Sequence, residues 1–146
     1  MLFRSRKIAQ LGHPILRQVA SPVSEEQLKS PEFQRLCDDL LEPMAAYEGL
    51  GLAAPQVHES LRVVVFQLDD EEPMFLVNPV ITVLGEKRSS GYEGCLSVHA
   101  MRGRVERADA IRVEALDRQG ERYAFRAEGW AARVVQHECD HLDGVL

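Results

Sequence analysis

The segment His137-Glu138-Cys139-Asp140-His141 constrains the fold more than any other feature of this 146-residue chain. Two histidines four residues apart return to nearly the same face of an α-helix, where both imidazoles can hold one metal ion. Glu138 follows the first histidine and can reach a water on that ion as a general base. The pattern predicts a metal-activated hydrolase site; the plainer alternative is two surface histidines with an acid between them.

This segment belongs to a longer helical pattern, predicted to run from about Trp130 to Asp143. Five residues fall on one stripe of that helix: Trp130, Val134, His137, His141 and Val145. The stripe is predominantly apolar, so the two histidines are predicted to lie on a face that points into the protein. Gly144 is a suitable residue at which to end the helix.

Two further helices are predicted near the start of the chain. Ser24 has the spacing of a capping box, and Ser30 followed by Pro31 marks a second helix start. From Phe33 onward, apolar residues recur at helical spacing and indicate an amphipathic helix that ends before Gly49.

The middle of the chain carries strand signals. Leu61–Leu68 and Phe75–Leu84 are rich in β-branched residues, with Pro79 marking an edge strand or a bulge. Apolar and charged residues alternate over 111–115, and Asp117–Gly120 is typical of a hairpin turn. This order of elements predicts an α+β fold, with mostly antiparallel strands packed around the C-terminal metal-binding helix that bears HExxH.

Composition narrows the class of protein. The length predicts a single domain spanning residues 1–146. A net charge of −6 argues against binding to nucleic acid or to an acidic membrane surface. Three cysteines form no disulfide framework, which favours a reducing, cytoplasmic location. No apolar run approaches the roughly 18 residues that a membrane span requires.

A catalytic metal needs roughly three protein ligands and one open position. Only five residues follow His141, so the downstream ligand of a zincin peptidase is missing and the third ligand must lie upstream. The candidates are Cys95, His99, His58, His13 and the acidic residues. Cys95 follows a predicted turn at Gly91-Tyr92, and a thiolate with two imidazoles is a known open set. Its alternative role is that of a small buried apolar residue.

A glycine-rich segment, GLGLAAPQ, runs from residue 49 to residue 56. Its glycines and small residues permit tight backbone packing, and Gln56 adds an amide donor. The simplest interpretation is a connector between helix and strand. A phosphate-binding loop is excluded, because the segment has no Lys-Ser/Thr after it and lacks the G-x-G-x-x-G spacing.

Three motifs in this order resemble the peptide deformylase family. GLGLAAPQ begins at Gly49, EGCLS at Glu93 and QHECDH at Gln136, and each matches the family pattern. The segment Gly12–Arg17 near the N-terminus resembles the opening of the family, so the resemblance covers nearly the whole chain. It implies hydrolysis of the N-formyl group from the formyl-methionine of nascent peptides, with release of formate.

The resemblance also implies residue roles. The metal ligands would be Cys95, His137 and His141, with Glu138 as the general acid and base. Gln56 and the backbone N–H of Leu96 would bind the oxyanion. The substrate would be held by the backbone of Leu50, Gly51 and Gly94, with Arg102 at the pocket mouth and Val134 in the methionine pocket. Glu93 and Arg107 would form a supporting ion pair.

The cofactor implied by the resemblance is one divalent ion, Fe(II) in the cell, with Ni, Co or Zn as replacements in a purified sample; ligand chemistry alone would favour zinc. We expect a monomer acting on N-formyl-methionyl peptides.

The sequence departs from the family pattern at two places. His99-Ala100 replaces the usual loop sequence, and the chain stops at Leu146, which argues against docking on the ribosome. A zincin-like peptidase and an inactive homologue that binds formyl-peptides are the alternative functions.

Overall fold

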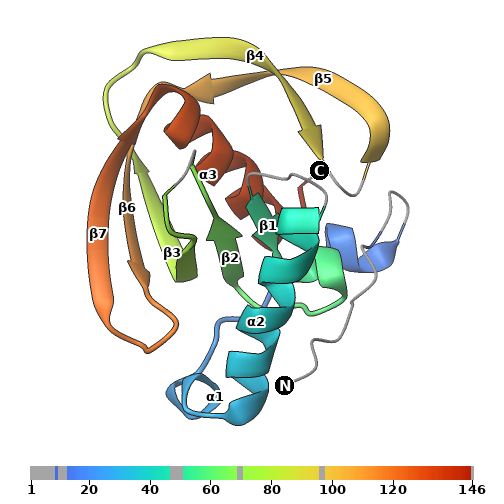
Figure 1. Cartoon of the computed structure of the whole chain (residues 1–146). Coiled ribbons are helices and arrows are strands. Elements are labelled where there is room, and N and C mark those ends of the chain that lie inside the picture. Colours follow the sequence, from blue (N-terminus) through green and yellow to red (C-terminus); the bar gives the residue numbers. More distant parts are fainter. Residues whose placement is uncertain (1–8, 10–12, 47–50, 69–70, 96–97, 146) are drawn as a thin grey trace.

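The computed structural model describes residues 9, 13–46, 51–68, 71–95 and 98–145, without the side chains of 45, 46, 92, 94, 95 and 98–103 (Figure 1). Helical elements are the 3₁₀ turns η1 (Pro14–Arg17) and η2 (Ala54–Val57) and the α-helices α1 (Glu25–Leu28), α2 (Pro31–Ala46) and α3 (Gly129–Leu142). Strands are β1 (Gly51–Ala53), β2 (Val63–Phe66), β3 (Met74–Val83), β4 (Arg88–Cys95), β5 (Val98–Ala108), β6 (Ala110–Leu116) and β7 (Arg122–Glu128). The predicted α+β fold with antiparallel strands and a C-terminal helix is confirmed.

The strands form two sheets. Five of them pair in the order β1-β2-β3-β6-β7, and every pairing is antiparallel. Strands β4 and β5 form a separate antiparallel hairpin, which arches over α3 in Figure 1. Helix α3 therefore lies between the hairpin and the larger sheet, where its residues can contact both.

The larger sheet is covered on both faces, as β2 demonstrates. Val64 and Phe66 pack in the cluster that contains α3, whereas Val63 and Val65 pack in the cluster that contains α2. Successive side chains of a strand point to opposite faces, so a strand buried on both faces must be apolar throughout. This explains the continuous apolar run in the sequence and places α2 and α3 on opposite sides of the sheet.

Local signals at helix starts and turns are confirmed. Ser24 forms a reciprocal capping box with Gln27 at the start of α1. The 111–115 alternation is the buried and exposed pattern of β6, and Gly120 takes a φ of 88° in the turn that leads to β7. None of the described helices is long and apolar enough to cross a bilayer.

The sequence left open whether Pro79 marks an edge strand or a bulge, and the backbone at Asn78 decides between them. Asn78 has a φ of 52°, and the pairing of β3 with β6 shifts register between Val77 and Val80. Strand β3 pairs on both sides, so Pro79 marks a bulge and not an edge strand. The Asn78 side chain joins this bulge to Val23 by accepting from its N–H at 2.8 Å and donating to its carbonyl at 2.9 Å.

Several details predicted from the sequence are wrong. Gly91-Tyr92 is no turn but lies inside β4, where a side chain on Gly91 would come within 3.1 Å of the Arg133 guanidinium. Trp130 and Val145 are 56% and 49% exposed, because they lie at the first turn of α3 and beyond its end. The glycine-rich segment contains strand β1 and is not merely a connector.

Candidate metal centre and active site

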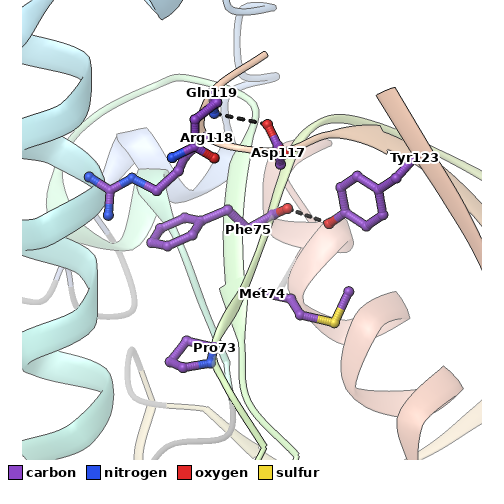
Figure 2. A pocket seen from close by; sticks show the side chains of 7 residues that line it. All are labelled: Pro73, Met74, Phe75, Asp117, Arg118, Gln119 and Tyr123. Carbon is purple, nitrogen blue, oxygen red and sulfur yellow. Dashed lines mark hydrogen bonds between the residues drawn. The ribbon is translucent and has the colours of Figure 1, made fainter. Parts of the chain in front are cut away.

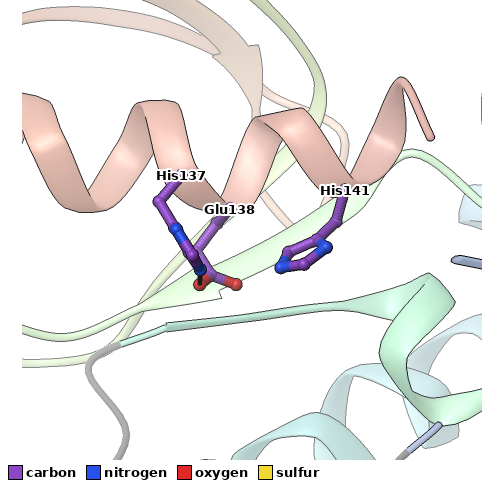
Figure 3. A group of neighbouring side chains, drawn as sticks. All are labelled: His137, Glu138 and His141. Atoms are coloured by element: carbon purple, nitrogen blue, oxygen red, sulfur yellow. Dashed lines mark ion pairs between the residues drawn. The ribbon is translucent and has the colours of Figure 1, made fainter. Parts of the chain in front are cut away.

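Helix α3 brings His137, Glu138 and His141 together on one face (Figure 3). One ligand atom from each lies within 4.8 Å of the others, and the two imidazole rings are 5.2 Å apart. Among the described residues, His137 Nε2 and Glu138 Oε2 are buried without a hydrogen-bond partner. Buried polar atoms without partners are costly, and these atoms converge. The donor set fits one divalent cation.

Glu93 on β4 fixes the orientation of the first histidine. Its Oε1 lies 2.9 Å from His137 Nδ1. An ionised carboxylate only accepts hydrogen bonds, so Nδ1 carries the proton and Nε2 presents its lone pair. His137 Nε2 lies 3.6 Å from Glu138 Oε1, on the side where the ligand atoms converge. This carboxylate–histidine pair is the usual support for a metal-binding imidazole.

Two arginines hold Glu93 in turn. Arg107 contacts it through two nitrogens at 2.9 and 3.1 Å, and Arg133 donates at 2.7 Å. Arg107 also pairs with Asp140 on α3. Burial opposes ionisation of Glu93, but the hydrogen bonds from Arg107, His137 and Arg133 outweigh it and hold its pKa below the ordinary value. The predicted Glu93–Arg107 ion pair is confirmed.

Arg133 and Asp140 contact the residues around His137, and the sequence analysis did not predict these contacts. They lie four residues before and three residues after His137, so helical spacing places them beside it. The helical spacing could have predicted that both residues lie beside His137, but it could not identify Glu93 and Arg107 as their partners.

Glu138 is enclosed by α3 and β1. Its pKa is raised to about 8, mainly by burial and also by the charge of Glu93, while Arg107 opposes the shift. A Cβ placed on Gly51 would lie 2.7 Å from Glu138 Cγ, so only glycine lets β1 approach this carboxyl. The second glycine of GLGLAAPQ therefore has a packing role beside Glu138 that the sequence did not show.

The second histidine, His141, is 1% exposed. Burial lowers the pKa of His141 to about 3, and the charges of His137 and Arg107 contribute in the same direction. A neutral imidazole is the form that binds a metal ion. The protein environment therefore keeps His141 in its ligand form across the physiological pH range.

Gln56 occupies the 3₁₀ turn η2, which packs against α3. It is 1% exposed, and its side-chain Oε1 accepts a hydrogen bond of 3.0 Å from the Ala53 N–H. Ala9 N–H donates to the Gln56 carbonyl at 2.6 Å. The amide is thus held in one orientation, with its NH₂ group on the side away from Ala53 N.

The other predicted site residues divide into three groups. Gly94, Cys95 and Arg102 lie in the β4–β5 hairpin, where Gly94 pairs with Arg102 and Cys95 with Val98; the side chains of Cys95 and Arg102 lie outside the described part. Leu50 and Leu96 lie outside the described residues. Val134 is 7% exposed in the core cluster of α3.

The alternative metal ligands do not join this centre in the described part of the chain. His13 and His58 contact each other, with ring centroids 4.6 Å apart, and neither belongs to the cluster on α3. His99, expected in a loop, lies in strand β5, and its side chain is outside the described part.

A separate depression of about 360 Å³ lies beside the β6–β7 turn (Figure 2). It is lined by Pro73, Met74, Phe75, Asp117, Arg118, Gln119 and Tyr123. Its polar groups have structural partners: the Tyr123 hydroxyl donates to the Phe75 carbonyl, and Asp117 accepts from the Gln119 N–H at 2.9 Å. This depression contributes nothing to the metal centre.

Comparison with known proteins agrees with this geometry. The family model for polypeptide deformylase matches residues 5–146. The chain belongs to the polypeptide deformylase family. Peptide deformylase 1 of Bordetella pertussis is 45% identical over 95% of this chain and 83% of its own length. A peptide deformylase of Leptospira biflexa is 41% identical over 97% of this chain and 84% of its own length.

Solved structures of the family share the fold closely. A class I type b peptide deformylase from Acinetobacter baumannii with Met-Ala-Ser bound superposes with a TM-score of 0.93 at 38% identity, covering 98% of this chain and 97% of the other. The Thermotoga maritima enzyme superposes with a TM-score of 0.91 at 36% identity, covering 98% and 95%.

Proposed function

We propose that this protein is a metal-dependent peptide deformylase, which removes the formyl group from the N-terminal formyl-methionine of nascent peptides and releases formate. The observation that carries the proposal is the cluster of His137, Glu138 and His141 on α3 in a chain of this family. The binding of Met-Ala-Ser to the Acinetobacter baumannii relative supports a peptide with N-terminal methionine as the product.

The proposed metal ligands are Cys95, His137 and His141. Cys95 is the last residue of β4, two residues after Glu93, whose carboxylate contacts His137. A divalent ion held there would supply Lewis acidity for the formyl oxygen and would lower the pKa of the attacking water. We propose Fe(II) as the ion used in the cell, with Ni, Co or Zn able to replace it, on the basis of the family resemblance.

Glu138 carries the proton in the proposed mechanism. Its carboxylate accepts a proton from the water whose oxygen attacks the formyl carbon. When the carbon–nitrogen bond breaks, the same carboxyl gives that proton to the departing amine nitrogen. Formate and a peptide with a free N-terminus result. The burial of Glu138 supports this role, because it raises the affinity of the carboxyl for a proton.

Negative charge develops on the formyl oxygen during the attack. We propose that the Gln56 amide and the Leu96 N–H donate to that oxygen. The hydrogen bond from Ala53 to Gln56 Oε1 orients the amide before substrate arrives. One preorganised donor of this kind is typically worth about 3 kcal/mol of barrier.

The remaining proposed roles concern substrate binding. The backbone of Leu50, Gly51 and Gly94 would pair with the peptide, because a strand edge can accept an extended chain. Arg102 would lie at the pocket mouth, and Val134 would line the methionine pocket. A monomer suffices for this proposal, because every proposed residue lies on one chain. We propose a cytoplasmic location, where the protein would meet nascent formylated peptides.

Turnover of formyl-Met-Ala tests the proposal. The metal-loaded protein should release one formate per free Met-Ala, whereas the Glu138→Gln variant should release almost none. Metal binding without formate release would instead identify an inactive homologue. Cleavage of internal peptide bonds in an unformylated peptide would identify a zincin-like peptidase.

A further inference from the structure

One face of α3 attaches the β4–β5 hairpin to the helix. The hairpin does not pair with the larger sheet among the described residues, so beyond its base at Asp109 its side-chain contacts with α3 position it. Four residues of α3 supply the contacts: Arg133, Gln136, His137 and Asp140. Their spacing of three, four and seven residues places them on one face of the helix.

Arg133 makes contacts with both strands of the hairpin. Its Nη2 donates to the Ser89 carbonyl on β4 at 2.6 Å. Its Nη1 donates to the Val105 carbonyl on β5 at 2.8 Å and to Glu93 Oε2 at 2.7 Å. Only a planar guanidinium offers several donors in a fixed fork. The side chain is 11% exposed, so these bonds lie largely away from water.

The position of Arg133 relates the two parts of the proposed metal centre. Glu93, which Arg133 contacts, orients His137 and lies two residues before Cys95, where β4 ends. Gly91 on the same strand leaves room for the guanidinium, since a Cβ there would lie 3.1 Å from Arg133 Cζ. A shift of the hairpin would therefore move Cys95 relative to the histidines of α3.

Charge balance depends on Arg133 as well. Glu93 and Asp140 are two carboxylates, and Arg107 and Arg133 are the two cations that contact them. Without Arg133, the single charge of Arg107 would face both carboxylates and could not neutralise them. Glu93 would lose one of its bonds and gain freedom to turn away from His137.

We propose that Arg133 is a positioning residue for the metal centre: it fixes β4, which ends at Cys95, against the helix that carries His137 and His141, and thereby governs how long the metal is retained. This proposal rests on the proposed function, specifically on Cys95 as the third ligand.

Arg118 provides a matched control. It also connects a hairpin to a helix, because it lies in the β6–β7 turn and donates to the Gln34 carbonyl and to Asp38 on α2, each at 2.9 Å. Its side chain is 20% exposed, and it lines the depression in Figure 2, which is separate from the metal cluster. Replacing Arg118 by Met removes comparable contacts without touching the metal centre.

The test uses full-length protein loaded with Co(II), whose absorption reports a bound thiolate. Arg133→Met should release Co(II) to a chelator about 10–100-fold faster than the unsubstituted protein, the usual effect of removing a residue that supports a ligand. Its thiolate-to-cobalt absorption band should weaken. Arg118→Met should lower the melting temperature but leave both the release rate and the band unchanged. Equal release rates in the two variants would show that Arg133 is merely structural.

Two further variants keep the outcomes distinct. Arg133→Lys keeps the charge but cannot bond three acceptors in one plane, so it should fold and release Co(II) at an intermediate rate. If Arg133→Met does not fold, an unchanged release rate in Arg133→Lys overturns the proposal. Cys95→Ala should abolish the thiolate band. A band that survives in Cys95→Ala overturns the ligand assignment itself, and not only the role of Arg133.

Discussion

On one face of α3, His137, Glu138 and His141 direct buried polar atoms toward a common point, while on an adjoining face Val135, Cys139 and Leu142 pack into the apolar core. Both faces are shielded from water: Glu138 is 5% exposed and Cys139 is 7% exposed. Burial alone therefore does not separate the chemical face of this helix from its packing face.

The two faces differ in the side chains that surround them. Burial raises the pKa of both Glu138 and the Cys139 thiol, so both hold their protons more tightly than in water. Glu138 lies beside two imidazoles, whereas Cys139 lies among apolar side chains and stays an inert thiol. Changes on the two faces should therefore have very different effects.

The largest effect is expected for Glu138→Gln. The amide keeps the shape of the side chain but cannot accept the proton, so kcat for formate release should fall by about 10²–10⁴-fold. Metal content, measured on the same sample, should be unchanged. A variant that keeps near-normal kcat would remove Glu138 from the mechanism.

A smaller loss is expected for Gly51→Ala, which pushes a methyl group against Glu138. The new Cβ would lie 2.7 Å from Glu138 Cγ, so the carboxyl must move. Misplacement of a catalytic group by about 1 Å can cost about 10²-fold in kcat. If Gly51 acts through Glu138, the same change in a Glu138→Gln background should cost little more. Additive losses would assign Gly51 a separate role.

The metal-free protein should become less stable as the pH rises from 6.5 to 8. The folded-state pKa of Glu138, about 8, lies above its ordinary value of 4.5, so its contribution is complete below pH 4.5 and is lost as the pH rises through 8. His141 is neutral in the folded state, but its imidazole in the unfolded chain is about half protonated at pH 6.5, which offsets about 0.4 kcal/mol of this loss. The free energy of unfolding should fall by about 1 kcal/mol across this window.

Urea titrations at several pH values measure that loss. Metal-free Glu138→Gln is the control, and its stability should not fall between pH 6.5 and 8, because His141 alone makes it rise slightly. An equal slope in both proteins would mean that a different group titrates.

The smallest effect is expected for Cys139→Ala on the packing face. Removing one buried sulfur should cost about 1 kcal/mol of stability, because it leaves a small cavity. Formate release and metal content should match the unsubstituted protein. A loss of activity here would contradict the division of α3 into a chemical and a packing face.

The sequence predicted those features that depend on residues close together in the chain. The spacing of His137 and His141 predicts their common face, and the capping box at Ser24 predicts a helix start, because each depends on residues within one or two turns. The position of Cys139 away from the histidines follows from the same periodicity and is confirmed by its place in the core.

Contacts between distant segments could not be predicted in this way. Arg133 contacts Glu93 across 40 residues, and no local pattern announces that pairing. Gly91 resembled a turn residue because glycine favours turns, yet its role is to admit the Arg133 guanidinium to a strand. Gly51 resembled part of a connector for the same reason, although its missing side chain makes room for Glu138.

We expect α3 and the end of β4 to hold one metal ion together. The X-ray absorption spectrum of the zinc-loaded protein, recorded at the zinc edge, reports the atoms bound to that ion. We expect one sulfur at about 2.3 Å and two imidazole nitrogens at about 2.0 Å in the coordination shell. A shell without sulfur, or with a third imidazole, would rule out Cys95, His137 and His141 as the ligand set.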